Sequence, residues 1–144
     1  MRRRRRWHRP ASARIPLTHR GLATGVRYVT GHRKANEPLD LDWVALADPE
    51  TTLVVYMGLA NIEEIAGKLI ASGLSPDTPV LAVCQGTTPR EQRIITLLAA
   101  LPAAAEEAGF AGPVLFIIGR VAAIAMQRNE QDDATDSEAI AVVA

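Results

Sequence analysis

The residues of this sequence best placed to bind a ligand follow three short apolar runs. The pair Met57-Gly58 ends the first run, the stretch Gln85-Gly86-Thr87-Thr88 follows the second, and Gly119 follows the third. In open α/β sheets, ligands bind beyond the carboxyl ends of strands, and glycine lets a backbone approach a ligand closely. The sequence therefore predicts a ligand-binding edge around Met57-Gly58 and Gly86.

Other kinds of chemistry find little support. His8, His19 and His32 lie far apart, without the spacing of metal ligands. Cys84 is the single cysteine, which excludes an internal disulfide and a cysteine-rich zinc site. It ends an apolar run, so we expect inert core there rather than a nucleophile. The sequence contains no glycine-rich dinucleotide loop, phosphate-binding loop or nucleophile elbow, so motifs alone indicate a soluble α/β domain.

The elements that position this edge can be read from the hydrophobic pattern. Short runs rich in apolar and β-branched residues predict four strands, at residues 26–30, 52–57, 79–84 and 114–118. Residues 31–42 predict a loop. Residues 92–98 fit a strand or a helix equally well, and both remain open.

Two helices are expected between the strands. Asn61, with Glu64 three residues later, has the spacing of a capping box. Apolar residues then recur on one helical face until Gly73 ends the helix. The order strand, helix, strand over residues 52–84 predicts a βαβ unit with a parallel strand pair and a right-handed crossover. Pro102 can begin a second helix, which Gly109 ends.

The charges divide the 144 residues into three parts. Residues 1–34 hold 11 of the 16 Lys and Arg and no acid, and the residues from 128 onward hold five acids and one base. We expect a disordered basic arm at residues 1–14, an α/β body at 15–123 and an acidic tail at 124–144. No apolar run reaches the ~20 residues that a membrane-spanning helix needs, so no membrane partner is expected.

The basic arm allows a reading unrelated to catalysis. Five consecutive arginines followed by Trp7 could contact phosphates and stack on a base, as in a nucleic-acid-binding module. The arm is short, however, and the body from residue 35 onward is acidic. We therefore expect a solvated arm without a nucleic-acid partner, and nucleic-acid binding stays as the alternative.

Four segments of the body resemble one family in their order and spacing. They are Ile15-Pro16-Leu17-Thr18-His19-Arg20 with Val29-Thr30-Gly31-His32, then Leu41-Asp42-Trp43, then Thr52 to Ala60 with its Tyr56-Met57-Gly58, and finally Gly86-Thr87-Thr88-Pro89 with Gln92-Arg93. This pattern, over residues 15–121, resembles the second half of the uroporphyrinogen-III C-methyltransferases within the tetrapyrrole methylase superfamily. The resemblance implies the C-terminal domain of that fold, a mixed sheet with flanking helices.

The resemblance also implies a reaction. The family transfers methyl groups from S-adenosyl-L-methionine to ring carbons of uroporphyrinogen III, which gives precorrin-2 on the way to sirohaem or cobalamin. It further implies a cytoplasmic homodimer. Because the ring carbons are electron-rich and the sulfonium is a good leaving group, positioning of the two reactants supplies much of the rate.

Three residues acquire roles from the matching motifs. Met57 and Gly86 are implied to contact the cofactor, and Arg20 to bind the carboxylates of the substrate, for which arginine is suited. No side chain is implied as a catalytic residue and no metal is implied. We expect Met57 and Gly86 to lie together at strand ends, with Arg20 on the same rim.

The sequence also departs from this family. Nothing in it matches the family's first half, which is implied to form the other side of the cofactor pocket. We therefore expect the chain alone to be inactive, and a non-catalytic remnant is a second alternative. The match begins abruptly at Ile15 after an arginine-rich stretch, and we interpret residues 1–14 as a possible product of a shifted reading frame.

Overall fold

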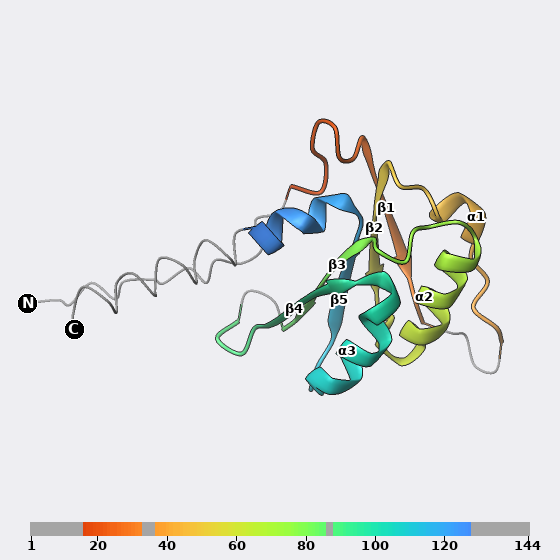
Figure 1. Cartoon of the computed structure of the whole chain (residues 1–144). Coiled ribbons are helices and arrows are strands. Elements are labelled where there is room, and N and C mark those ends of the chain that lie inside the picture. The colour runs from red at the N-terminus through yellow and green to blue at the C-terminus, as the bar shows by residue number, and fades with distance from the viewer. Residues whose placement is uncertain (1–15, 33–36, 86–87, 128–144) are drawn as a thin grey trace, which may run out of the picture.

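The apolar runs form the strands of a single five-stranded sheet (Figure 1). The structure, a computed structural model, describes residues 16–32, 37–85 and 88–127. The sheet contains β1 (Gly25–Thr30), β2 (Thr51–Tyr56), β3 (Pro79–Cys84), β4 (Gln92–Leu97) and β5 (Val114–Ile118). The helices are α1 (Trp43–Leu46), α2 (Ile62–Ala71) and α3 (Leu101–Ala108), with short 3₁₀ turns η1 (Leu59–Asn61), η2 (Leu98–Ala100) and η3 (Arg120–Ala122). The predicted mixed sheet with flanking helices is confirmed.

The order of the strands differs from the expected βαβ pair. Across the sheet the order is β1-β2-β5-β3-β4. β2 and β3 run in the same direction, because each pairs antiparallel with β5, but β5 lies between them. The prediction that β2 and β3 form an adjacent pair is therefore wrong. Their spacing in the sequence fits a crossover past one intervening strand equally well, and β5, which is almost wholly buried, takes the central place.

The helices α2 and α3 cover one face of the sheet (Figure 1). The predicted apolar face of α2 is confirmed, since Ile62, Ile65, Ala66 and Leu69 are buried. They pack into one cluster with strand residues such as Val55 and Phe116. Burying such side chains contributes about 1.5–3 kcal/mol each, so this face holds most of the stabilising apolar contact.

The predicted capping box at Asn61 is wrong. The Asn61 side chain makes no hydrogen bond to the start of α2. Its amide nitrogen Nδ2 instead donates to the carbonyl oxygen of Gly31, 2.8 Å away. Asn61 ends the turn η1 with φ −117° and ψ 15°, and its side chain ties down the loop after β1.

The predicted ends of the helices and the place of Pro102 are confirmed. Gly73 follows α2 with φ 111°, and Gly109 ends α3 with φ 58°. Pro102 lies in the first turn of α3, as expected. Residues 92–97, which fitted two interpretations, form the edge strand β4. The short helix α1 was not predicted; the Asp42 carboxylate accepts a hydrogen bond from the backbone N–H of Ala45 at 3.1 Å and so caps it.

The other face of the sheet is only partly covered. The turn η3 continues as a helix over residues 123–127 (Figure 1). Here Val121, Ala122 and Ala125 pack against Leu81 and Ile117. The expected boundary at residue 123 falls inside this helical segment. The basic arm at 1–14 and the tail from residue 128 lie outside the described residues.

Candidate functional site

An open hollow lies at the edge where β2 and β3 end and β5 begins. Its volume is about 300 Å³, and its lining comes from three segments: Tyr56 and Met57, Val83 and Gln85, and Pro113, Val114 and Leu115. Other hollows lie between η1, α2 and α3, away from the strand ends. The hollow at the strand ends has no carboxylate and no basic side chain in its lining, so it suits a ligand held by apolar contact and by backbone groups.

The backbone is strained on both sides of this hollow. Met57 has φ 51° and Gln85 has φ 52°, and among the described residues these are the two non-glycine residues with positive φ. The left-handed conformation costs an L-residue about 1–2 kcal/mol. Each of the two residues directly follows the last residue of its strand. Strain of this kind clusters at ligand sites. The residues that follow β2 and β3 are therefore candidates for ligand contact.

Tight packing holds the Met57 turn in place. The N–H of Gly31 donates to the carbonyl oxygen of Tyr56 at 2.7 Å. A Cβ on Gly31 would lie 2.6 Å from the Cα of Gly58 and 2.9 Å from Ile65 Cδ1, so only glycine fits there. With the Asn61 bond to Gly31, these contacts fix the loops after β1 and β2 against each other. The Met57 side chain is left 60% exposed beside the hollow.

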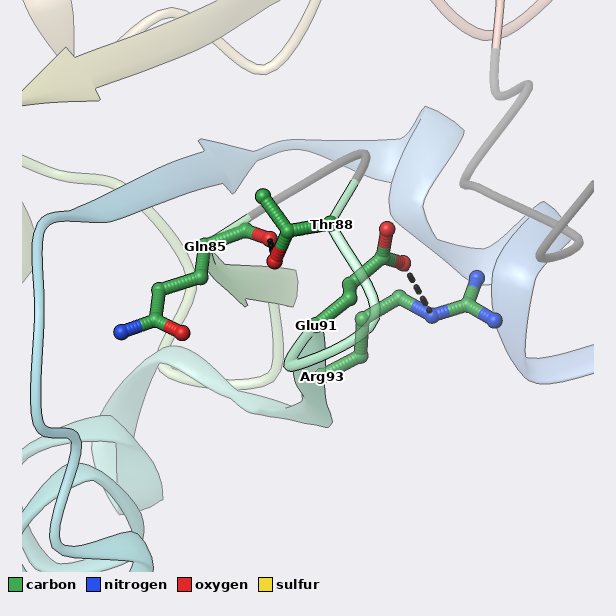
Figure 2. Close-up of polar contacts among 4 residues, drawn as sticks. All are labelled: Gln85, Thr88, Glu91 and Arg93. Atoms are coloured by element: carbon green, nitrogen blue, oxygen red, sulfur yellow. Dashed lines mark hydrogen bonds and ion pairs between the residues drawn. The ribbon is translucent and has the colours of Figure 1, made fainter.

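The Gln85 turn is held by hydrogen bonds. The carbonyl oxygen of Gln85 accepts from the Thr88 hydroxyl at 2.7 Å and from the Thr88 N–H at 3.3 Å (Figure 2). The Gln85 N–H donates to the carbonyl oxygen of Pro113 at 3.4 Å. The Gln85 side chain lies against Gly112, where an added Cβ would come within 2.9 Å of Nε2. These contacts hold Gln85 against Thr88 and against the segment that precedes β5.

The structure does not bring all three predicted site residues together at the hollow. Met57 lines the hollow, as expected. Gly86 lies outside the described residues, although its neighbour Gln85 is at the hollow. Arg20 is exposed in the turn between His19 and Ala23, which precedes β1.

The expectation that Arg20 shares a rim with Met57 is wrong. β1 runs parallel to β2 with Gly25 opposite Thr51 and Thr30 opposite Tyr56. The turn before β1 therefore lies beside the start of β2, whereas Met57 follows its end. A strand rises about 3.3 Å per residue, so the length of a six-residue strand separates the two. Motif order along the chain carried no information about which end of the sheet each motif reaches.

Sequence reasoning missed several lining residues. Tyr56, Val83 and Leu115 belong to the strands themselves, and only the register of the strands shows that they adjoin. It also missed that the Tyr28 and Tyr56 rings stack with centroids 6.2 Å apart. Both are exposed, and large exposed aromatic residues on strands were a signal that could have been used.

A carboxylate with a shifted pKa, Asp48, lies at the end of the sheet where β2 begins. Hydrogen bonds from the Glu50 N–H and the Thr51 hydroxyl hold the pKa of Asp48 below its usual value, and Arg27 and Arg120 act in the same direction. No group of three or more metal-ligating side chains occurs within the described ranges. Over the same ranges, no helix is long and apolar enough to cross a bilayer.

Comparison with known proteins finds one family. Residues 9–102 match the model of the Tetrapyrrole (Corrin/Porphyrin) Methylases. The chain is 59% identical over 114 residues to a uroporphyrinogen-III C-methyltransferase of Paracoccus denitrificans, covering 79% of this chain and 40% of that protein. It is 48% identical over 111 residues to a siroheme synthase of Azotobacter vinelandii, covering 77% of this chain and 24% of that protein.

A solved structure agrees with these relatives. It is a uroporphyrin-III C-methyltransferase of Thermus thermophilus in complex with S-adenosylhomocysteine. The similarity has a TM-score of 0.65 and 35% identity, and covers 76% of this chain and 48% of that one. The chain thus spans less than half the length of each of these proteins.

Proposed function

Because this chain belongs to the tetrapyrrole methylase family, we propose that it forms one half of the active site of a uroporphyrinogen-III C-methyltransferase. The observation that carries the proposal is the hollow at the ends of β2 and β3, with strained residues on both sides. Strained, exposed residues around an apolar hollow are typical of a binding site rather than of core packing. The compartment proposed is the cytoplasm.

The ligand proposed for the hollow is S-adenosyl-L-methionine. Met57 contacts it from the end of β2, and Gly86, directly after Gln85, contacts it from the loop after β3. The uncharged lining suits the adenosine part and the methylene groups of the molecule. The related Thermus protein, whose crystal contains S-adenosylhomocysteine, supports this choice.

The proposed substrate is uroporphyrinogen III and the product is precorrin-2, a precursor of sirohaem and cobalamin. In each transfer, a π electron pair of a pyrrole carbon forms the new bond to the methyl carbon. The methyl–sulfur bond breaks and its electron pair stays on sulfur, leaving neutral S-adenosylhomocysteine. The ring then loses a proton. The protein's part is to align the two reactants, which by itself lowers the barrier substantially.

The role of Arg20 needs a second chain. Arg20 lies beside the start of β2, so it cannot reach a substrate held at the end of β2 in the same copy. In the proposed homodimer, Arg20 of one copy serves the substrate bound by the other. Arg20→Ala should then weaken binding of the substrate more than binding of the cofactor, and equal losses would indicate a structural role.

Titration calorimetry of the full chain with S-adenosylhomocysteine tests the cofactor proposal. We expect saturable one-to-one binding that Met57→Gly weakens and Arg20→Ala leaves unchanged. Transfer of a radioactive methyl group to uroporphyrinogen III, measured in parallel, should be undetectable for the chain alone, because the chain spans less than half the length of these relatives. Absence of any binding would favour the non-catalytic remnant.

A further inference from the structure

One row of residues crosses the whole sheet beside the hollow. The strand register aligns Thr30 with Tyr56, Tyr56 with Leu115, Leu115 with Val83, and Val83 with Arg93. Directly paired residues point to the same face of a sheet. This face is the one that α2 and α3 leave uncovered, since the helices pack on Val55 and Phe116, the neighbours of Tyr56 and Leu115 along their strands.

The two ends of this row differ in chemistry. At one end, Tyr56 stacks on Tyr28, and both rings are exposed. In the middle, Leu115 and Val83 are half-buried and line the hollow. At the other end stands Arg93 on the edge strand β4. Tyr56 and Arg93 are three strands apart, which is about 14 Å at the usual spacing of strands.

The guanidinium of Arg93 is held in one orientation. Its Nε donates to the Glu91 carboxylate at 3.2 Å, and the Glu91 side chain is only 7% exposed. Figure 2 shows the two terminal nitrogens of Arg93 on the far side of the guanidinium from that carboxylate. They have no partner among the described residues. Arginine has five N–H donors, so the outer edge of Arg93 can bind a second carboxylate.

We propose that Arg93 is a substrate-binding residue that pairs with a carboxylate of an acidic tetrapyrrole. The macrocycle lies across the mouth of the hollow that holds the methyl donor, with the exposed Tyr56 on one side, and Arg93 binds an acidic side chain at its periphery. An apolar ring rimmed by carboxylates suits an apolar surface that ends in a cation, and this row of the sheet offers both, although Leu115 and Val83 also pack against the cluster of Val121 and Ala122. The inference rests on the proposed function and deepens it.

Fluorescence titration of the full chain with uroporphyrin III, a stable porphyrin with eight carboxylates, tests the inference. Arg93→Gln should raise the Kd about 10-fold or more, because a hydrogen bond to a charged group is lost. The matched control is Arg90→Gln, which removes the same charge from an exposed position in the turn just before β4. It should change the Kd less than about 2-fold, as expected for a screened surface charge.

A second variant and a second ligand distinguish failure of this inference from failure of the proposed function. Arg93→Lys keeps the charge but loses the planar guanidinium that can pair with a carboxylate through two hydrogen bonds. This variant should bind uroporphyrin with intermediate affinity. It replaces Arg93→Gln in the test if that variant does not fold. Equal affinities of Arg93→Gln and Arg90→Gln, or no uroporphyrin binding by the wild-type chain, would overturn the inference. Binding of S-adenosylhomocysteine, measured on the same samples, is expected to be unchanged; its absence in wild type would overturn the proposed function instead.

Discussion

The two ends of the sheet turn the chain in different ways. At the end where β1 and β2 begin, left-handed backbone falls on glycines, Gly21 with φ 81° and Gly119 with φ 147°. At the end where β2 and β3 finish, it falls on Met57 and Gln85. A glycine adopts this conformation without strain and a side-chain-bearing residue does not. The second end therefore keeps two side chains at a cost in stability.

Hydrogen bonding shows the same contrast. At the amino end, the Thr52 hydroxyl donates to the Leu17 carbonyl at 2.6 Å, and Arg120 Nε donates to the Pro49 carbonyl at 3.1 Å. Both bonds join segments that are far apart in the sequence. At the carboxyl end, the exposed Met57 and the half-buried Gln85 border an open hollow. The amino end has a smaller hollow of about 170 Å³, lined by residues that include Gly21, Glu50 and Arg120. Among the described residues, the carboxyl end differs in that strained residues with side chains border its hollow.

The largest expected effect comes from breaking the support of the carboxyl end. Gly31→Ala places a Cβ 2.6 Å from the Cα of Gly58, a backbone atom that cannot move alone. We expect a loss of about 3 kcal/mol in the free energy of unfolding, as for an overpacked core, measured by urea denaturation.

Gly67→Ala is the matched control for this substitution. Gly67 lies in α2 with no atom within 4 Å of an added Cβ. Alanine is the better helix former, so this variant should be stabilised by about 0.5–1 kcal/mol. A Gly31→Ala protein as stable as wild type would show that the loops after β1 and β2 are not locked together.

A smaller effect of opposite sign is expected at Met57. Met57→Gly relieves the left-handed strain, so the free energy of unfolding should rise by about 1 kcal/mol while binding of S-adenosylhomocysteine weakens. Leu97→Gly serves as control, since Leu97 is also a partly exposed apolar residue at a strand end but has an ordinary φ of −100°. That variant should lose stability. Destabilisation of both variants alike would remove the argument from strain.

The smallest effect belongs to the amino end. Since the pKa of Asp48 is lowered in the folded chain, its carboxylate stabilises the fold above the unfolded pKa of about 4. That contribution is lost as the pH falls through the lower, folded value. Asp48→Asn should therefore be less stable than wild type at pH 6, and the difference should shrink as the pH falls below about 4. A difference that does not change with pH would exclude this carboxylate as its source.

The sequence predicted the parts of the fold that depend on local pattern. The apolar runs became strands, Gly73 and Gly109 ended their helices, and Met57 directly follows the end of a strand. The predictions that were wrong concerned features set by residues far away in the sequence. The insertion of β5 between β2 and β3 and the place of Arg20 at the opposite end both follow from strand order. The Asn61 side chain took a partner thirty residues away instead of the local cap.

The residues of the candidate site also divide into those predicted from local pattern and those that only the arrangement of the strands reveals. Met57 was predicted because it follows a strand and belongs to a recognisable motif. Gln85 belongs to the stretch that was predicted after the second apolar run, whereas Leu115 and Arg93 gained their places only from the register of the sheet. Periodicity fixes which way a side chain points along its own strand, but not which strand lies next to it.

The central claim, that the end of β2 and the end of β3 hold the cofactor, can be tested at a single atom. The chain has three methionines, Met1, Met57 and Met126, so labelling their methyl groups with ¹³C gives three NMR signals, and Met57→Leu assigns the one that matters. On titration with S-adenosylhomocysteine, the Met57 signal should shift and saturate while the Met126 signal stays in place. Saturable binding that leaves the Met57 signal unmoved would place the cofactor elsewhere and contradict this account.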